Sequence, residues 1–119
     1  MNSITPRIVR ATISRADLSH IATTQFGDMV KAVVDVERSV MAIAAELHSD
    51  EEAMLIEDGS RQADLWGINL YPAELTGQFI EFDSMINVRP SQGNRSRDVE
   101  DPETRGRIGQ VVGLLVSDA

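Results

Sequence analysis

The stretch that decides the fold is Met29-Val30-Lys31-Ala32-Val33-Val34-Asp35-Val36-Glu37. Apolar residues alternate with charged ones along most of it, which is the period of a β-strand, and Val33 is the one departure. A short connection at 37–39 leads into residues 40–48, which continue the pattern and predict a second strand. Alanine and leucine between residues 41 and 47 also suit a helix. The valine-rich first half favours a hairpin, and an antiparallel sheet follows from it.

Further periodic segments lie on both sides of this hairpin. Apolar residues at helical spacing predict helices, and alternation predicts strands. The predicted helices cover residues 15–26, 50–58 and 101–116, the predicted strands cover 65–71 and 79–88, and residues 1–13 form an arm or edge strand. We therefore predict one α+β domain over residues 1–119, with a single antiparallel sheet of about four strands covered on one face by two or three helices.

Three helix starts carry recognisable capping residues. Ser14 is a typical N-cap for the first helix, and Ser49 with Glu52 has the spacing of a capping box for the second. Asp101 followed by Pro102 is a strong start for the third, because proline suits the first helical position. These signals fix where each predicted helix begins.

Composition excludes several classes of protein. The chain has 119 residues, no cysteine and a net charge of −8. That charge disfavours nucleic acid and anionic membranes as partners. No segment approaches the roughly 20 apolar residues of a spanning helix, and the start lacks an apolar run of signal-peptide length. We therefore expect a cytoplasmic protein without a nucleic-acid or membrane partner.

Residues 89–97 are the most polar part of the chain and contain three arginines. Guanidinium and hydroxyl groups around a flexible glycine suit an anion such as phosphate or carboxylate. We predict that Arg89, Arg95 and Arg97 clamp such a ligand and that Ser91 and Asn94 orient it. The alternative is that these arginines pair with acids of the chain itself, such as those at 98, 100 and 101. No known phosphate-binding motif is present.

One face of the predicted strand 79–88 carries polar residues and leads into this loop. If strands 65–71 and 79–88 form a hairpin, Asn69 shares that face with Glu81, Asp83 and Asn87. We predict that Asn69 and Asn87 contribute to ligand binding and that Asp83 is a weak catalytic candidate. The alternative is a plain solvated face, which antiparallel sheets often have.

His48 is the second weak catalytic candidate. On a strand, Glu46, His48 and Asp50 point the same way, so they are also a weak alternative for a divalent cation. A single histidine beside acids is more often a surface residue, and no metal site is otherwise predicted. No cofactor and no reaction class follow from the sequence.

Several blocks of the chain resemble a family of small prokaryotic proteins catalogued as a domain of unknown function. The blocks are residues 26–35, Glu46-Leu47-His48, Leu65-Trp66-Gly67-Ile68-Asn69 and residues 81–97. The resemblance covers roughly residues 26–116. It implies a bacterial or archaeal intracellular protein, and it brings no activity, cofactor or catalytic residue.

Two functions follow as expectations. The first is binding, or turnover, of a small anionic ligand at the 89–97 loop and the adjoining sheet face. The second is a non-catalytic interaction protein or homodimer, in which the acidic segment 46–58 of one copy meets the arginine-rich segment 89–107 of another. Whether the protein is an enzyme stays open at this level.

Overall fold

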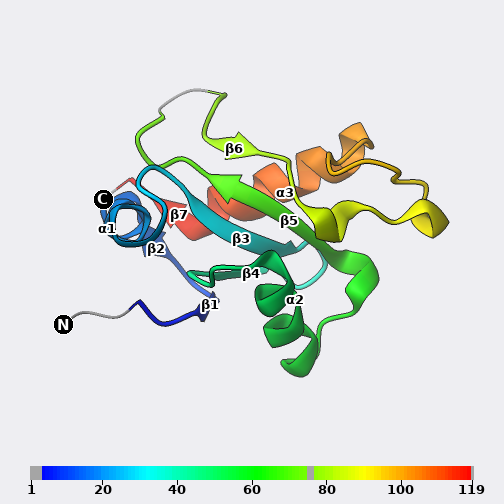
Figure 1. Ribbon diagram of the computed structural model, residues 1–119, viewed down its shortest axis with the longest axis horizontal. Coiled ribbons are helices and arrows are strands. Elements are labelled where there is room, and N and C mark those ends of the chain that lie inside the picture. The colour runs from blue at the N-terminus through cyan, green and yellow to red at the C-terminus, as the bar shows by residue number, and fades with distance from the viewer. Residues whose placement is uncertain (1–3, 75–76, 119) are drawn as a thin grey trace.

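The computed structural model describes residues 4–74 and 77–118, and its arrangement is shown in Figure 1. Within them, five antiparallel strands form one sheet in the order β1-β4-β3-β5-β6. These strands are β1 (Arg7–Val9), β3 (Val30–Asp35), β4 (Val40–Ile43), β5 (Leu65–Leu70) and β6 (Ile80–Glu81). A small parallel pair consists of β2 (Ile13–Ser14) and β7 (Val116–Ser117). The helices are α1 (Arg15–Gln25), α2 (His48–Glu57) and α3 (Pro102–Leu115). The predicted α+β class is confirmed, with one strand more than expected.

The helices cover both faces of the sheet, so the prediction of a single covered face is wrong. Helices α1 and α3 pack on one face, and α2 packs on the other (Figure 1). Val33, the residue that breaks the alternation of β3, explains the difference. It is fully buried with Leu55 of α2, whereas its neighbour Val34 points into the opposite core. A central strand with apolar residues on both faces needs cover on both.

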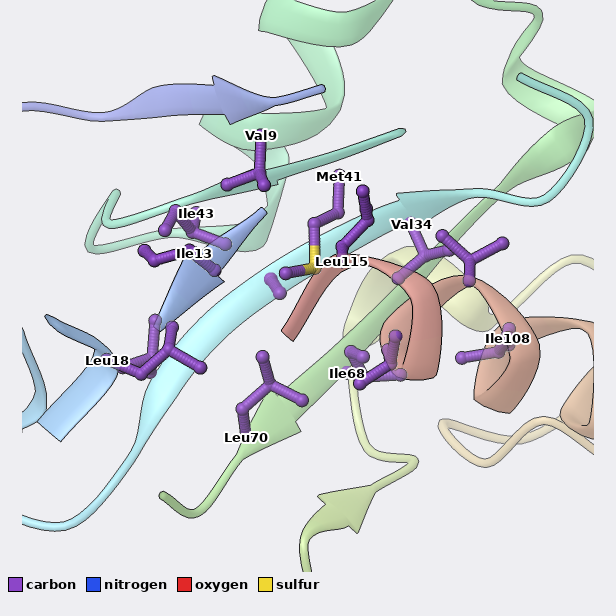
Figure 2. Close-up of a cluster of buried hydrophobic side chains, with 14 of the residues drawn as sticks. Val9, Ile13, Leu18, Val34, Met41, Ile43, Ile68, Leu70, Ile108 and Leu115 are labelled. Atoms are coloured by element: carbon purple, nitrogen blue, oxygen red, sulfur yellow. The ribbon is translucent and has the colours of Figure 1, made fainter. Parts of the chain in front are cut away.

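The larger core lies between the sheet and helices α1 and α3. Figure 2 shows its side chains from several elements meeting in one cluster. They include Val34 from β3, Met41 from β4 and Ile68 from β5, which face Ile108 of α3. The second core is smaller and sits under α2. Apolar side chains thus cover both faces of the sheet at β3. The polar residues of the sheet lie near the ends of strands and on the edge strands.

The central hairpin is confirmed, but its second strand is shorter than predicted. Strands β3 and β4 pair with Asp35 opposite Val40 and Ala32 opposite Ile43. Strand β4 ends at Ile43 because Ala44 has a φ of 74°, in the left-handed region that breaks strand geometry. Gln25 of α1 donates to the Ala44 carbonyl oxygen at 2.9 Å and helps to hold this bend. Residues 44–47 therefore leave the sheet.

Two of the predicted helix starts are confirmed and one is wrong. Ser14 Oγ accepts from the Asp17 N–H at 3.0 Å, and Asp101 caps α3 through the Thr104 N–H at 3.1 Å. Helix α2 begins earlier than its sequence signal indicated, with Leu47 at the N-cap position and no side-chain cap. Ser49 lies inside the first turn, so the capping box does not form.

The predicted strand 79–88 is reduced to two residues, and an asparagine replaces the rest. The Gly67 N–H of β5 donates to Asn87 Oδ1 at 2.8 Å, and Asn87 Nδ2 donates to the Gly67 carbonyl at 2.9 Å. This side-chain amide therefore pairs with β5 as a neighbouring strand would. The chain comes close to β5 here, since a Cβ on Gly67 would lie 2.5 Å from Ser84 Cβ. Only glycine allows this approach.

No helix in the described part of the chain is long and apolar enough to cross a membrane.

Candidate functional site

Arg89 is directed inward, and its donors are fully occupied. Guanidinium has five N–H donors. Nε donates to Ile86 O at 2.9 Å, Nη1 to Gln62 O at 2.9 Å, and Nη2 to Leu65 O at 2.5 Å. The remaining two donors reach Gln92 Oε1 and Glu52 Oε2. The guanidinium also lies 4.9 Å from the Trp66 ring centroid. Arg89, which is 9% exposed, holds the loop to the sheet and has no N–H left for a ligand.

Asn94 is likewise occupied by the loop itself. Its Nδ2 donates to the carbonyl oxygens of Asn87, Ser96 and Asp98, and its Oδ1 accepts from the Glu100 N–H at 2.9 Å. Asn87 and Asn94 are both buried. The two asparagines therefore build the 87–100 segment by replacing hydrogen bonds that a regular element would supply.

Other arginines of this region meet acids of the same chain, as the alternative interpretation expected. Arg97 Nε lies 2.6 Å from Asp83 Oδ1, and Arg105 Nη2 lies 2.5 Å from Asp98 Oδ1. Ser91 and Arg95 are exposed. Arg95 contributes its main-chain N–H to Glu100 at 3.0 Å, and its side chain contacts no acid among the described residues.

Part of the predicted site does come together on the face of the sheet that α2 covers. Asn69 lies opposite Glu81 in the β5–β6 pairing, and its Nδ2 donates to Glu81 Oε1 at 2.9 Å. The Tyr71 hydroxyl donates to the same oxygen at 3.0 Å. Burial, together with the hydrogen bond to Glu81, raises the pKa of Tyr71 to about 12. We call this group the sheet-face cluster; its members are Lys31, His48, Asn69, Tyr71, Glu81, Asp83 and Arg97.

His48 is the member of this cluster whose ring nitrogens have defined donor and acceptor roles. Its Nε2 lies 2.8 Å from the Ile68 carbonyl oxygen, which can only accept, so Nε2 carries the proton. Burial lowers the pKa of His48; Lys31 and Arg97 lower it further, while the carbonyl bond and Asp83 oppose the change. The imidazole is therefore neutral at pH 7. Within the described residues nothing donates to Nδ1, so its lone pair is free to accept a proton.

The metal alternative loses its geometric basis. His48 is the first residue of α2 rather than part of a strand. Glu46, His48 and Asp50 therefore do not share a face, since a helix rotates by about 100° per residue. The part of the chain that the structure describes contains no group of three histidine or acidic side chains placed to hold a metal ion.

Sequence reasoning missed two members of this cluster, Lys31 and Tyr71. Lys31 pairs with Asn69 in the β3–β5 register and is the only lysine of the chain. That lone lysine inside a valine-rich strand was the available signal. Asn69 itself is buried, and its Oδ1 has no hydrogen-bond partner in the described structure. A buried unpaired oxygen beside Lys31 leaves the cluster chemically incomplete.

Glu51 lies next to this cluster and is fully buried. Its Oε2 accepts from the Ala45 N–H at 3.1 Å, and its Oε1 has no partner among the described residues. Burial raises the pKa of Glu51 well above its ordinary value of 4.5, and the Ala45 N–H and Lys31 only partly oppose this. The folded state therefore favours the protonated carboxyl more strongly than the unfolded chain does.

Glu51→Gln is expected to change how stability depends on pH. Above pH 4.5 the unfolded chain has released this proton while the folded state retains it, so stability falls as the pH rises toward the raised value. The amide does not titrate. We expect the free energy of unfolding of the variant to rise relative to the parent between pH 4.5 and 8. The difference should be about 1–3 kcal/mol, the usual cost of a buried unsatisfied group. Urea unfolding at both pH values measures this, and Glu57→Gln, the same change at an exposed acid of α2, is the control. A parallel shift of both variants would contradict the assignment.

Comparison with known families gives one match. Residues 7–115 match a family described as protein of unknown function (DUF5674). The chain belongs to this family. The membership confirms the resemblance to a domain of unknown function and extends it toward the N-terminus, across β1 and α1. No curated protein and no solved structure matches the chain.

Proposed function

We propose that this DUF5674 protein binds a small anionic ligand, carrying a phosphate or carboxylate, at the sheet-face cluster. The observation that carries the proposal is His48, a neutral imidazole with Nε2 fixed by a carbonyl and Nδ1 unpaired. Lys31 and Arg97 are the cations that depress its pKa, so both lie near it. This moves the centre of the predicted site from Arg89 to Arg97.

The remaining groups have distinct roles in this proposal. Arg97 uses only Nε for Asp83, so among the described residues its two terminal nitrogens are available for ligand oxygens. Lys31 supplies a second positive charge, and buried Asn69 positions Glu81 through its Nδ2. His48 Nδ1 accepts a proton from a ligand that presents one, which is the group a turnover reaction would need. We place the protein in the prokaryotic cytoplasm, which a cysteine-free chain permits.

Ligand binding is tested by a thermal-shift screen of inorganic phosphate, nucleotides and small carboxylates, followed by calorimetry on any hit. Arg97→Gln is expected to weaken binding about tenfold or more, because a charge-assisted hydrogen bond of about 1.5–3 kcal/mol is lost. Arg95→Gln removes an equal charge two residues away and is expected to change the Kd less than twofold.

His48→Gln separates proton transfer from charge. Glutamine retains an N–H donor but cannot accept a proton at neutral pH, so the variant is expected to bind the anion while losing the pH dependence of binding. The absence of a hit in the screen, or equal weakening by the two arginine variants, would overturn the proposal.

A non-catalytic interaction protein is the second candidate, and one observation favours it. Leu114, Met85 and Leu47 are the most exposed large apolar side chains of the described residues, at 67%, 66% and 54%. Opposite charges between copies favour a homodimer less once the fold is known. Arg89 of the basic segment already pairs with Glu52 of the acidic segment within one chain. A strictly monomeric mass by light scattering would remove the homodimer form of this candidate.

A further inference from the structure

A second polar hollow lies on the α3 side of the sheet, away from the sheet-face cluster. It has a volume of about 280 Å³ and is walled by the 92–94 loop, the first turns of α3 and the start of β5. Figure 1 shows the yellow-to-orange segment before α3 at the end of the sheet where this hollow lies. Its size is just below the about 300–1,000 Å³ of drug-sized ligand pockets, so it suits a small molecule.

Four lining residues offer polar groups that the described part of the chain does not use. Asp64 makes no side-chain hydrogen bond there, and Asp101 uses only Oδ2, for Thr104. Arg107 uses only Nη2, for Val36 O and Glu37. Trp66 is 7% exposed, and its indole N–H donates to no described residue. The indole nitrogen is not among the fully buried unpaired atoms, so it is accessible to solvent. Trp66 lines the hollow.

These groups form two sets of opposite character. Asp64 and Asp101 are acceptors, and the Thr104 hydrogen bonds lower the pKa of Asp101, which keeps it ionised at neutral pH. Arg107 Nε and Nη1, with the indole N–H of Trp66, are donors. An acidic pair alone would suit any cation. The indole N–H of Trp66 and the unused N–H groups of Arg107 also line the hollow, and both need an acceptor. A simple cation has no acceptor to offer them.

We propose that this hollow binds a small zwitterion of the α-amino acid class. The ammonium group lies against Asp64 and Asp101, and the carboxylate accepts from Trp66 Nε1 and the free edge of Arg107. A ligand without net charge also avoids the repulsion that an anion would meet from Asp64 and Asp101. The site is separate from the proposed anion site and does not depend on it.

The chain contains a single tryptophan, so its intrinsic fluorescence reports on this hollow directly. The experiment titrates the full chain with a panel of L-amino acids, and with ethylamine and acetate as probes of each charge alone. We expect a saturable change in Trp66 emission with at least one amino acid. Each single-charge probe should bind at least about tenfold more weakly. Calorimetry on the same amino acid provides the Kd.

Two variants distinguish specific binding from other effects. Asp64→Asn is expected to weaken amino-acid binding about tenfold, whereas Asp50→Asn, the same change at an exposed acid of α2, leaves the Kd within twofold. Arg97→Gln of the anion site should also leave it unchanged. No saturable change with any amino acid, equal affinity for ethylamine, or full binding by Asp64→Asn would each overturn the proposal.

Discussion

Arg89→Leu is expected to lower the free energy of unfolding by about 3–5 kcal/mol, the usual loss when one partner of a buried ion pair is removed. The leucine leaves the carbonyls of Ile86, Gln62 and Leu65 without the donors they have in the native fold. It also leaves Glu52 without its partner at 3.3 Å. Urea unfolding followed by circular dichroism measures the effect.

Two comparisons make this expectation specific. Arg95→Leu places the same substitution on an exposed arginine of the same loop, and we expect a change within about 0.5 kcal/mol. Arg89→Lys retains the charge but offers one point donor in place of a planar fork, so it should recover little of the lost stability. Recovery by lysine would mean that charge, rather than the hydrogen bonds to backbone, holds the loop. A loss below about 1 kcal/mol for Arg89→Leu would contradict the structural role altogether.

The fold was predictable where local pattern and tertiary position agree. Alternation from Val30 to Asp35 predicted β3, and the Ser14 and Asp101 caps predicted the starts of α1 and α3. Val33 was treated as an exception to the pattern, although it marks the second buried face of a central strand. The position of α2 on that face depends on the bend at Ala44, whose φ of 74° has no signature in an alanine.

The polar cluster on the sheet face was predicted only in part. Alternation along β5 placed Asn69 on the same face as Glu81, and their hydrogen bond confirms this contact. The same reasoning assigned Asn87 to the ligand, because a polar side chain on a strand face looks available. Its amide instead accepts from the Gly67 N–H and donates to the carbonyl oxygens of Gly67 and Arg97. A sequence cannot reveal this, since the pairing depends on how closely the chain returns to β5. Lys31 was read only as the polar half of a strand pattern.

Arginine and asparagine in this chain illustrate why a polar loop is ambiguous. Both residue types suit ligand oxygens, and both also suit main-chain carbonyls that a loop leaves unpaired. Arg89 and Asn94 serve carbonyls of their own loop and of nearby strands. Arg97 and Arg95, in the same loop, face outward. Burial separates the two uses, and burial is a property of the assembled fold.

Asn87→Ala is expected to lower the free energy of unfolding by about 2–4 kcal/mol, because each buried polar group left unpaired costs about 1–3 kcal/mol. The substitution removes the partner of both the Gly67 N–H and the Gly67 carbonyl. It also removes one of the donors to the Arg97 carbonyl oxygen at 3.0 Å. The 87–100 segment would then lose its hydrogen bonds to Gly67 of β5.

The Gly67 amide gives a local test of this role, because its N–H is protected by a side chain rather than by a neighbouring strand. Hydrogen exchange followed by NMR should show faster exchange at Gly67 in Asn87→Ala than the global loss of stability alone produces. Ser91→Ala, an exposed position in the same loop, should leave that exchange unchanged. Unaltered Gly67 protection in Asn87→Ala would mean that another group closes this edge of β5. In that case Asn87 would not be the reason that strand β6 is only two residues long.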